Sequence, residues 1–252
     1  MKRLKGIKPG WGVLPVIVFL GLWELVARSD LVPGHFLPPF STVMQEFYYL
    51  SASGVLGENF LSSLGRVLIG LIAGSMAGIT LGLIMGWQST MDKALHPIIS
   101  LLYPIPTLGW LPLLMLWIGI NEMLPITLIF ISSFFPVLYN TVTGVKNVNK
   151  DYIRVAKTLG ASNLKILRTI AIPLALPNIF TGLRLEAGMA WRVIIAAEMV
   201  AIPTGIGAMM IKAQSLIRID IIIVSLIVLA AMTFSFERFF AYIEKKLTAK
   251  WR

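Results

Sequence analysis

Apolar runs long enough to cross a lipid bilayer dominate this chain, and a spanning helix needs about 20 apolar residues. Hydrophobic residues make up 57% of the 252 residues and charged residues 13%, whereas an ordinary soluble domain is about 25% charged. This composition excludes a disordered chain and argues against a soluble globular domain. The runs predict an all-α, polytopic membrane protein with about six spans, at residues 11–27, 66–87, 94–120, 124–142, 181–201 and 220–242.

The placement of the positive charges predicts the orientation of these spans. The net charge is +10, which in a soluble protein would suggest nucleic acid, but cytoplasmic loops of membrane proteins collect Lys and Arg. With a cytoplasmic N-terminus, 17 of the 22 Lys and Arg residues lie inside. The four outside are Arg28, Arg66, Lys212 and Arg218, and Arg192 falls within a span. We therefore expect both termini to be cytoplasmic and the surroundings to be lipid, with no nucleic acid.

The first apolar run has two interpretations. A basic segment at residues 1–10 followed by apolar residues 11–27 is the pattern of a secretory signal peptide. An uncleaved span is favoured, because Glu24 interrupts the run and the small-residue cleavage pattern is poor. We expect Glu24 to reach the membrane interface. An extracytoplasmic loop at residues 28–58 then follows, with a short amphipathic helix near residues 41–50.

The residue inventory argues against catalysis by this chain. It has no cysteine, which excludes thiol chemistry and Cys-ligated metals. His35 and His96 are its only histidines, so no metal site is expected. The phosphate-cradling loop G-x-x-x-x-G-K-[ST] is missing, so we do not expect the chain to hydrolyse ATP. An intramembrane enzyme is disfavoured for the same reasons.

Glycine recurs at every fourth position of the second span. The five residues are Gly70, Gly74, Gly78, Gly82 and Gly86. Residues at i and i+4 share one face of a helix, and such a smooth ridge lets another backbone approach closely. Four overlapping GxxxG motifs predict tight helix packing, but they carry no information about a substrate.

The third span is interrupted by prolines. The stretch from Tyr103 to Pro112 reads Tyr-Pro-Ile-Pro-Thr-Leu-Gly-Trp-Leu-Pro, and each interior proline removes a backbone hydrogen bond. Irregular backbone at membrane depth is tolerated only where it is buried in protein or lines a wet cavity. Two interpretations stay open: a kinked packing helix, or a gate to which Tyr103, Thr107 and Trp110 contribute.

The fifth span carries ionisable side chains at Glu186, Arg192 and Glu198. Such groups cost about 2.5–3.5 kcal/mol near the bilayer centre on insertion scales, so they usually face protein or water. Spaced six apart, they point about 120° apart on a regular helix and cannot line one lumen together. Trp191 and Glu198 share a face, whereas a rise of about 9 Å disfavours an Arg192–Glu198 pair. The candidates for a pathway or gate in this span are Trp191, Arg192 and Glu198, and we expect one of the ionisable groups to face the pathway while the others pack between helices. The alternative is a structural Arg192 that is paired with an acid on a neighbouring helix.

A basic segment at residues 144–177 lies on the predicted inside. It holds Lys146, Lys150, Arg154, Lys157, Lys165 and Arg168 against one acid, Asp151. Helical stretches on either side of Gly160 would form a compact knob able to pass a movement from a soluble partner to the spans. The alternative is a juxtamembrane segment attracted to anionic lipid.

This segment resembles the EAA loop of ABC importer permeases. The resemblance rests on Asp151-Tyr-Ile-Arg-Val-Ala-Lys-Thr-Leu-Gly160 with Ala161-Ser162, on Ile172-Pro173 and on Pro177. The runs Ala190-Trp-Arg-Val-Ile-Ile-Ala-Ala-Glu-Met199 and Tyr103–Pro112 resemble the nitrate, sulfonate and taurine branch. Together these motifs cover residues 60–251 in order.

The chain departs from the family pattern at one point, where Arg154-Val155-Ala156 replaces Glu-Ala-Ala. A family glutamate that meets a basic residue of the ATPase would here be a repulsive arginine, unless the ATPase supplies an acid or Asp151 takes over. The resemblance assigns coupling to the ATPase to seven residues: Asp151, Arg154, Ala156, Leu159, Gly160, Ala161 and Pro173.

The resemblance implies a multi-pass permease subunit in the inner membrane of a prokaryote, importing a small anion such as nitrate, a sulfonate, taurine or bicarbonate. It implies a second copy of the chain, two ATP-binding subunits that hold ATP and Mg²⁺, and an extracytoplasmic binding protein. Residues 1–60 would form the N-terminal basic segment, first span and loop, and residues 61–252 the core, with the coupling loop at about 145–178. The alternative is a secondary transporter or channel, which predicts repeats or acid–base relays.

Overall fold

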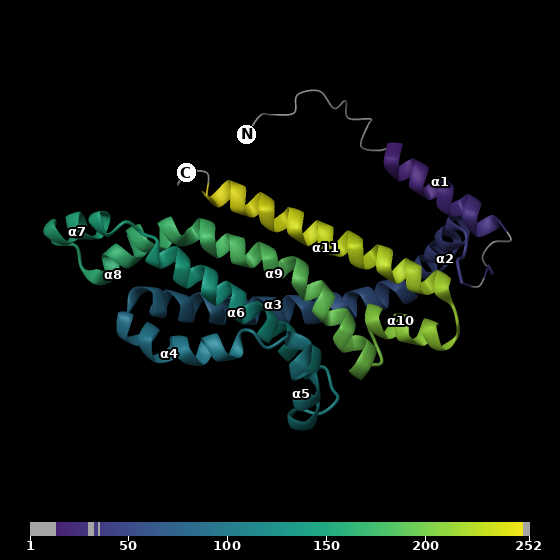
Figure 1. Cartoon of the computed structure of the whole chain (residues 1–252), viewed down its shortest axis with the longest axis horizontal. Helices are drawn as coiled ribbons and strands as arrows, with labels where there is room; N and C mark the ends of the chain where they lie inside the picture. The colour runs from purple at the N-terminus through teal and green to yellow at the C-terminus, as the bar shows by residue number, and fades with distance from the viewer. Residues whose placement is uncertain (1–13, 30–32, 35, 249–252) are drawn as a thin grey trace.

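The computed structural model describes residues 14–29, 33–34 and 36–248, and within them all regular secondary structure is helical. The helices are α1 Leu14–Arg28, α2 Phe40–Ala52, α3 Val55–Trp87, α4 Ser89–Leu102, the 3₁₀ turn η1 Thr107–Trp110, α5 Leu111–Trp117, α6 Met123–Lys146, α7 Lys150–Thr158, α8 Asn163–Ile166, the π-helical turn η2 Leu167–Ala171, α9 Ile172–Ala201, α10 Ile206–Ser215 and α11 Ile219–Thr248 (Figure 1). The prediction of an all-α membrane protein is confirmed.

Four helices are long and apolar enough to cross a membrane: α3, α6, the continuous stretch Asn163–Val200 and Ile219–Leu247. A fifth span is possible if Ser89–Leu102 and Thr107–Trp117, which are bent by 85°, form one broken span. The first predicted span begins outside the described residues, and α1 is its described part. The described residues therefore hold four or five candidate spans rather than the six expected.

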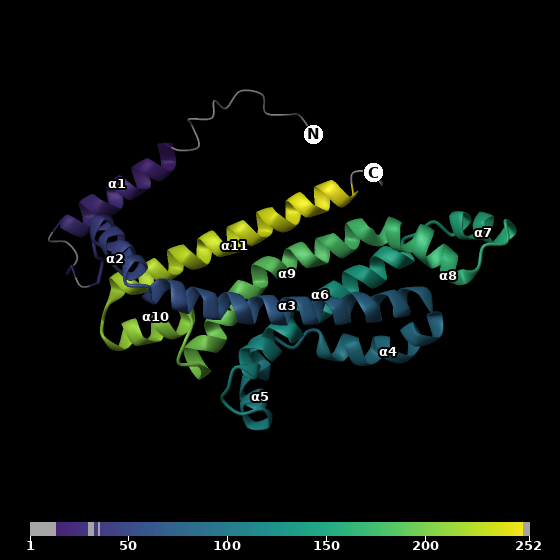
Figure 2. The same cartoon turned by 180° about the vertical axis from the view of Figure 1, so that it is seen from behind.

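The four long helices lie side by side, with α6 between α3 and α9, and α9 between α6 and α11 (Figures 1 and 2). Fully buried side chains fill the interfaces, among them Leu128 and Ile129 from α6 and Trp191 and Ile194 from α9. Figure 2 shows α7 and α8 at one end of this bundle and α2 and α10 near the other. We call these the α7 end and the α10 end.

Three element boundaries differ from the sequence expectations. Helix α3 begins at Val55 rather than near residue 66, because Gly54, at φ +80°, is the break after α2. The predicted loop at residues 202–218 contains α10, which starts after Gly205 at φ +110°. The helix of the fifth span is continuous back to Asn163. In each case the helical residues are too polar or glycine-rich to be predicted as a span from the sequence.

The predicted amphipathic helix near residues 41–50 is α2, and its start is fixed by Glu24 in α1. The Glu24 carboxylate accepts hydrogen bonds from the Ser41 amide at 3.1 Å, the Ser41 hydroxyl at 2.8 Å and Arg28 Nε at 2.7 Å. Glu24 therefore holds α1 to α2, a role that the sequence did not indicate.

Candidate functional site

The glycine ridge of α3 lies against α6 along its whole length. A Cβ atom would lie 2.7 Å from the Phe134 carbonyl oxygen at Gly78 and 2.6 Å from Thr141 Cβ at Gly82. Similar contacts with α6 occur at Gly70, Gly74 and Gly86. Side chains at these positions would have to push the two helices apart, because in several cases the neighbouring atom is backbone.

A buried network of charges joins α3, α9, α10 and the start of α6 at the α10 end. Arg66 Nη1 donates to Glu198 Oε1 at 2.6 Å, and Arg66 Nε and Nη2 donate to the two Glu122 oxygens at 2.6 and 2.8 Å. Thr204 accepts from the same guanidinium through its carbonyl and its hydroxyl, at 2.9 and 2.6 Å. Arg66 thus directs its donors to two regions that are far from it in the sequence, one at Glu122 and one at Glu198 and Thr204. We call Arg66, Glu122, Glu198, Ser63 and Thr204 the Arg66 network.

The Glu198 carboxylate is completely buried and fully hydrogen-bonded. Ser63 Oγ lies 2.9 Å from both of its oxygens, and the Gly207 amide donates to Oε2 at 3.0 Å. Gly205 and Gly207 leave room for it, since a Cβ on either would collide with the Glu198 side chain. A buried charge with these partners is stabilised in place and has no free acceptor for a further ligand.

The two carboxylates of the network differ in exposure. Glu198 is buried, but the Glu122 side chain is 63% exposed, in the turn between α5 and α6. The hydrogen bonds from Arg66 lower the pKa of the Glu122 carboxyl below its ordinary value. Glu122 is therefore the partner that solvent can reach.

The structure separates the predicted pathway residues instead of gathering them. Trp191 and Glu198 lie on the buried side of α9, and the Trp191 indole stacks on Phe60 with centroids 6.3 Å apart. Arg192 is exposed on another side of α9. As expected from their spacing, Arg192 and Glu198 do not pair, and Glu198 pairs with Arg66 instead.

Arg192 lies on an open stripe of α9. The exposed residues of that stripe are Leu185, Met189, Arg192 and Val200, with Ala196 half-buried among them. The only polar contact of Arg192 in the described part of the chain is Nη1 to Met189 Sδ at 3.5 Å. The guanidinium thus has no carboxylate partner within the described protomer, and the alternative of an acid on a neighbouring helix is not seen there.

The proline-rich segment breaks the third span, as the sequence predicts. Helix α4 ends before Tyr103, and the backbone turns through η1, where Gly109 donates to the Pro106 carbonyl at 2.7 Å. The Tyr103 ring packs on Tyr139 of α6, with centroids 4.7 Å apart. Thr107 and Trp110 are half-buried in η1, which contacts α9. The buried Trp110 Nε1 and Trp191 Nε1 atoms have no hydrogen-bond partner among the described residues.

At the α7 end, residues 149–173 form a helix–turn–helix that we call the α7 knob. Asn149 caps α7 by accepting from the Asp151 amide at 2.8 Å. Gly160 ends it at φ +79°, with the Ala161 amide donating to the Ala156 carbonyl at 3.0 Å, the arrangement of a Schellman C-cap. The turn therefore requires a left-handed residue at position 160, which glycine supplies without strain.

The second arm of the α7 knob runs into α9 through the π-helical turn η2. Pro173 is the second residue of α9 and has no amide hydrogen, so the regular bonding pattern is interrupted just before it. Asp151 and Arg154 are exposed and paired with each other at 3.3 Å, as their i, i+3 spacing allows. Asp151 thus partly offsets the charge of Arg154.

The α7 knob leaves apolar side chains open. Leu159 is 81% exposed, and Tyr152 and Val155 are also exposed. With Ala156 they border a groove of about 390 Å³ whose other side is formed by Thr169, Ile170 and Leu174. An apolar groove on a protruding helix hairpin is a surface suited to a protein partner.

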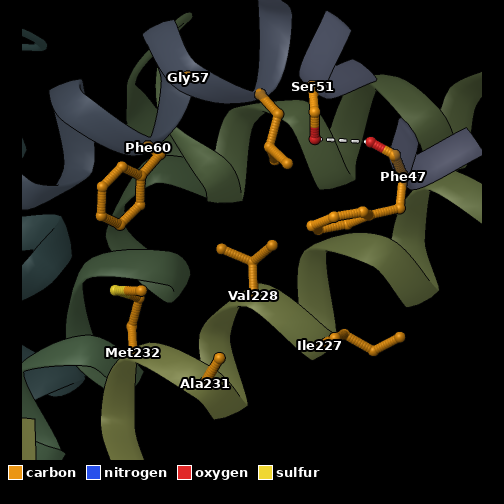
Figure 3. A pocket seen from close by; sticks show the side chains of 9 residues that line it. Phe47, Ser51, Gly57, Phe60, Ile227, Val228, Ala231 and Met232 are labelled. Carbon is orange, nitrogen blue, oxygen red and sulfur yellow. Dashed lines mark hydrogen bonds between the residues drawn. The ribbon is translucent and has the colours of Figure 1, made fainter. Parts of the chain in front are cut away.

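Figure 3 shows another apolar cavity, of about 390 Å³, between α2, α3 and α11. Phe47, Phe60, Val228 and Met232 point into it, and its one polar side chain, Ser51, donates to the Phe47 carbonyl at 2.7 Å. The cavity offers no group that would hold an anion. It is therefore not a candidate substrate site.

Residues 70–249 match the family model of the binding-protein-dependent transport system inner membrane component. The chain belongs to this family. It is the permease subunit of an ABC importer, and the predicted resemblance is confirmed. The taurine transport system permease protein of Escherichia coli is 35% identical over 236 residues, covering 92% of this chain and 86% of that protein. The bicarbonate transport system permease protein of Synechocystis is 36% identical over 245 residues, also covering 92% and 86%.

The fold is shared with the MetNI methionine ABC transporter in an inward-facing conformation. The TM-score is 0.60 at 13% identity, over 77% of this chain and 98% of that chain. The likeness places this permease among known transporter folds but carries no information about its substrate.

The Arg66 network was not predicted from the sequence. Arg66 was expected outside with the loop charges, whereas it is the twelfth residue of α3 and only 4% exposed. The sequence did hold a signal for this network, because Asn59, Ser63 and Arg66 recur at helical spacing and give the start of α3 a polar side. In the structure, Asn59 accepts a hydrogen bond from the Gly205 amide at 2.9 Å. Among the described residues, no group of three His, Asp or Glu side chains is placed to hold a metal.

Proposed function

We propose that this permease imports a small anion such as nitrate, a sulfonate, taurine or bicarbonate, by alternating access driven by a separate ATPase. The taurine and bicarbonate relatives support this solute class. The observation that carries the proposal is Arg192, an exposed guanidinium in a spanning helix without a carboxylate partner in the described protomer.

The position of Arg192 favours a wet surface over lipid. An arginine at the helix centre costs about 2.5–3.5 kcal/mol on insertion scales unless it meets water or protein. Its planar fork of donors fits an oxyanion in two-point contact. We propose that the α9 stripe with Arg192 faces the pathway beside the segment from Tyr103 to Trp110, across from a second copy of the chain.

Trp191 and Glu198 have a different part in this proposal. Both are buried, so they act from behind the pathway wall by holding α9 in position. The Arg66 network closes the α10 end, which is the extracytoplasmic end if the cations of the α7 knob are cytoplasmic. A binding protein would deliver the solute at that end.

The α7 knob is the proposed contact for two ATP-binding subunits, one for each copy of the permease, which hold ATP and Mg²⁺. The open side chains of Tyr152, Val155 and Leu159 supply an apolar contact. We also propose that both termini are cytoplasmic, and that residues 61–252 form the core to which residues 1–60 add the first span and loop.

Cysteine scanning tests the pathway, because the chain has no native cysteine. Single cysteines at Tyr103, Thr107, Trp110, Arg192, Trp191 and Glu198 would be treated with a water-soluble thiol reagent in the reconstituted complex, with and without ATP. Arg192→Cys should react and be protected by the transported anion, whereas Trp191→Cys should stay unreactive. An unreactive Arg192→Cys in both states would place that stripe in lipid or protein and refute the proposed pathway.

Transport by Arg192 variants tests the solute class. Arg192→Gln should raise the KM for the transported anion about tenfold or more, and Arg192→Lys should raise it less. ATP hydrolysis by the same variants without solute serves as the control, because it should differ little from that of wild type. Unchanged KM in Arg192→Gln would remove Arg192 from solute recognition.

A further inference from the structure

A cavity of about 370 Å³ lies beside α7, on the side away from the apolar groove. It is an open pocket bordered by α7, the ends of α3 and α6, and the start of α8. Three lysines line it, namely Lys146, Lys150 and Lys157, together with the indole of Trp87. Its wall is completed by apolar side chains, among them Val148 and Ile153.

Two of the three lysines have no counter-ion in the described part of the chain. Lys146 Nζ donates to Asp92 at 2.6 Å, but no ion pair involves Lys150 or Lys157. The acid nearest to them in α7 is Asp151, and it is paired with Arg154. The cavity is therefore short of negative charge and suited to an anion.

The cavity lies where spanning helices end. Trp87 is the last residue of α3, Lys146 is the last residue of α6, and Asn163 begins the long apolar helix that continues into α9. Ends of spanning helices lie at the membrane–water boundary, where Trp side chains are also enriched. An anion bound here would sit at the depth of lipid headgroups.

The cavity and the apolar groove use opposite faces of α7. Lys150, Ile153 and Lys157 are spaced i, i+3 and i+7 and share one face. Tyr152 and Val155 lie about 140–200° around the helix from Lys150 at about 100° per residue. If the groove face meets the ATPase, the lysine face stays open. This step, and the cytoplasmic side of the cavity, rest on the proposed function.

We propose that this cavity binds the headgroup of an anionic phospholipid. The phosphodiester would contact Lys150 and Lys157, and the glycerol would lie on the apolar wall, as in other basic pockets at the cytoplasmic ends of spanning helices. The bound lipid holds α7 against the ends of α3 and α6 and so fixes the orientation of the α7 knob toward its partner.

Native mass spectrometry of the assembled transporter, purified in mild detergent, counts phosphatidylglycerol and phosphatidylcholine molecules retained after titration with each. The test variant is Lys150→Gln/Lys157→Gln. The matched control is Lys165→Gln/Arg168→Gln, which removes the same charge from exposed positions of the α7 knob that do not line the cavity. Each lysine near the headgroup is worth about 1 kcal/mol, so the test variant should bind phosphatidylglycerol about 20–30-fold more weakly, and the control should match wild type.

Three results would overturn the proposal: no preference of wild type for phosphatidylglycerol, an equal loss in both double variants, or displacement of the lipid by inorganic phosphate at similar concentration. The second would indicate general surface attraction, and the third a site for a soluble anion. The lipid count is independent of which solute is transported, so a failure of the proposed anion import leaves this result interpretable.

Discussion

The α10 end and the α7 end of this permease treat their charged groups in opposite ways. At the α10 end, Arg66 and Glu198 are buried and every donor and acceptor between them has a partner inside the chain. At the α7 end, Leu159 is 81% exposed, and Lys150 and Lys157 have no ion pair in the described protomer. The charges of the Arg66 network are paired within the chain, whereas Lys150 and Lys157 are open to other molecules.

This difference separates what holds the permease together from what it does with partners. Buried charge pairs are costly to break and fix helices in one arrangement. Exposed apolar and cationic side chains add little to the stability of a single chain, but they provide binding surface. Substitutions at the two ends should therefore affect different measurements, namely stability at the α10 end and coupling at the α7 end.

The largest expected effect is that of Arg66→Leu. It leaves the Glu198 charge buried without compensation, and breaking a buried pair in this way costs about 3–5 kcal/mol. The unfolding temperature of the purified permease and its yield should fall sharply. Arg192→Leu makes the same chemical change on the open stripe of α9 and should alter stability by about 0.5 kcal/mol or less.

A second variant keeps the Arg66 prediction informative if Arg66→Leu does not fold. Arg66→Leu/Glu198→Gln removes both charges and keeps an amide that can bond Ser63 and Gly207, so part of the stability should return. If Arg66→Leu and Arg192→Leu lowered stability equally, the contrast between a self-contained end and an open one would be wrong.

The glycine ridge links the two ends, and Gly78→Leu tests that link. A side chain at Gly78 meets the backbone of α6 at Phe134 and Leu138, and overpacking of this kind costs about 1–3 kcal/mol. Gly65→Leu, in the same helix, has nothing within 4 Å of its new Cβ and should be tolerated. Thermal unfolding in detergent compares the pair, and equal behaviour would show that α3 and α6 separate at little cost.

Some of these features could be predicted from the sequence and others could not. The first kind depends on residues that are close in the sequence, and the second on contacts between residues that are far apart in it. The five ridge glycines and the Gly160 turn are visible as short-range spacings, and the structure has an interface and a left-handed residue there. The partners of Arg66 lie 56, 132 and 138 residues away, so no local pattern could assign them. Helix α10 was not predicted because Gly205 and Gly207 are typical of a loop. In the structure these two glycines leave room for the Glu198 side chain to approach the start of α10.

Gly160→Val tests the α7 end without touching the core. Valine at φ +79° costs about 1–2 kcal/mol in local strain and should change the angle between α7 and α8. Membrane insertion should stay close to wild type and the unfolding temperature should fall by only a few degrees, but solute-stimulated ATP hydrolysis by the assembled complex should be lost. Gly160→Asn is the control, since asparagine tolerates the left-handed region; normal stimulated hydrolysis in Gly160→Val would remove the turn from coupling.

The smallest expected effect is a pH dependence from Glu122, the exposed member of the Arg66 network. Its folded-state pKa is lowered by the hydrogen bonds from Arg66, below the value of 4.5 that applies without them. A depressed carboxyl pKa contributes stability that is present above the unfolded value and is lost as the pH falls through the folded value. The unfolding temperature of wild type should therefore fall below about pH 4.5 more steeply than that of Glu122→Gln, while the two curves run parallel above it. Glu58→Gln, an acid of α3 for which the described structure shows no ion pair, should follow wild type. If Glu122→Gln kept the full wild-type pH slope, the exposed arm of the network would add no stability, and closure of the α10 end would rest on Arg66 and Glu198 alone.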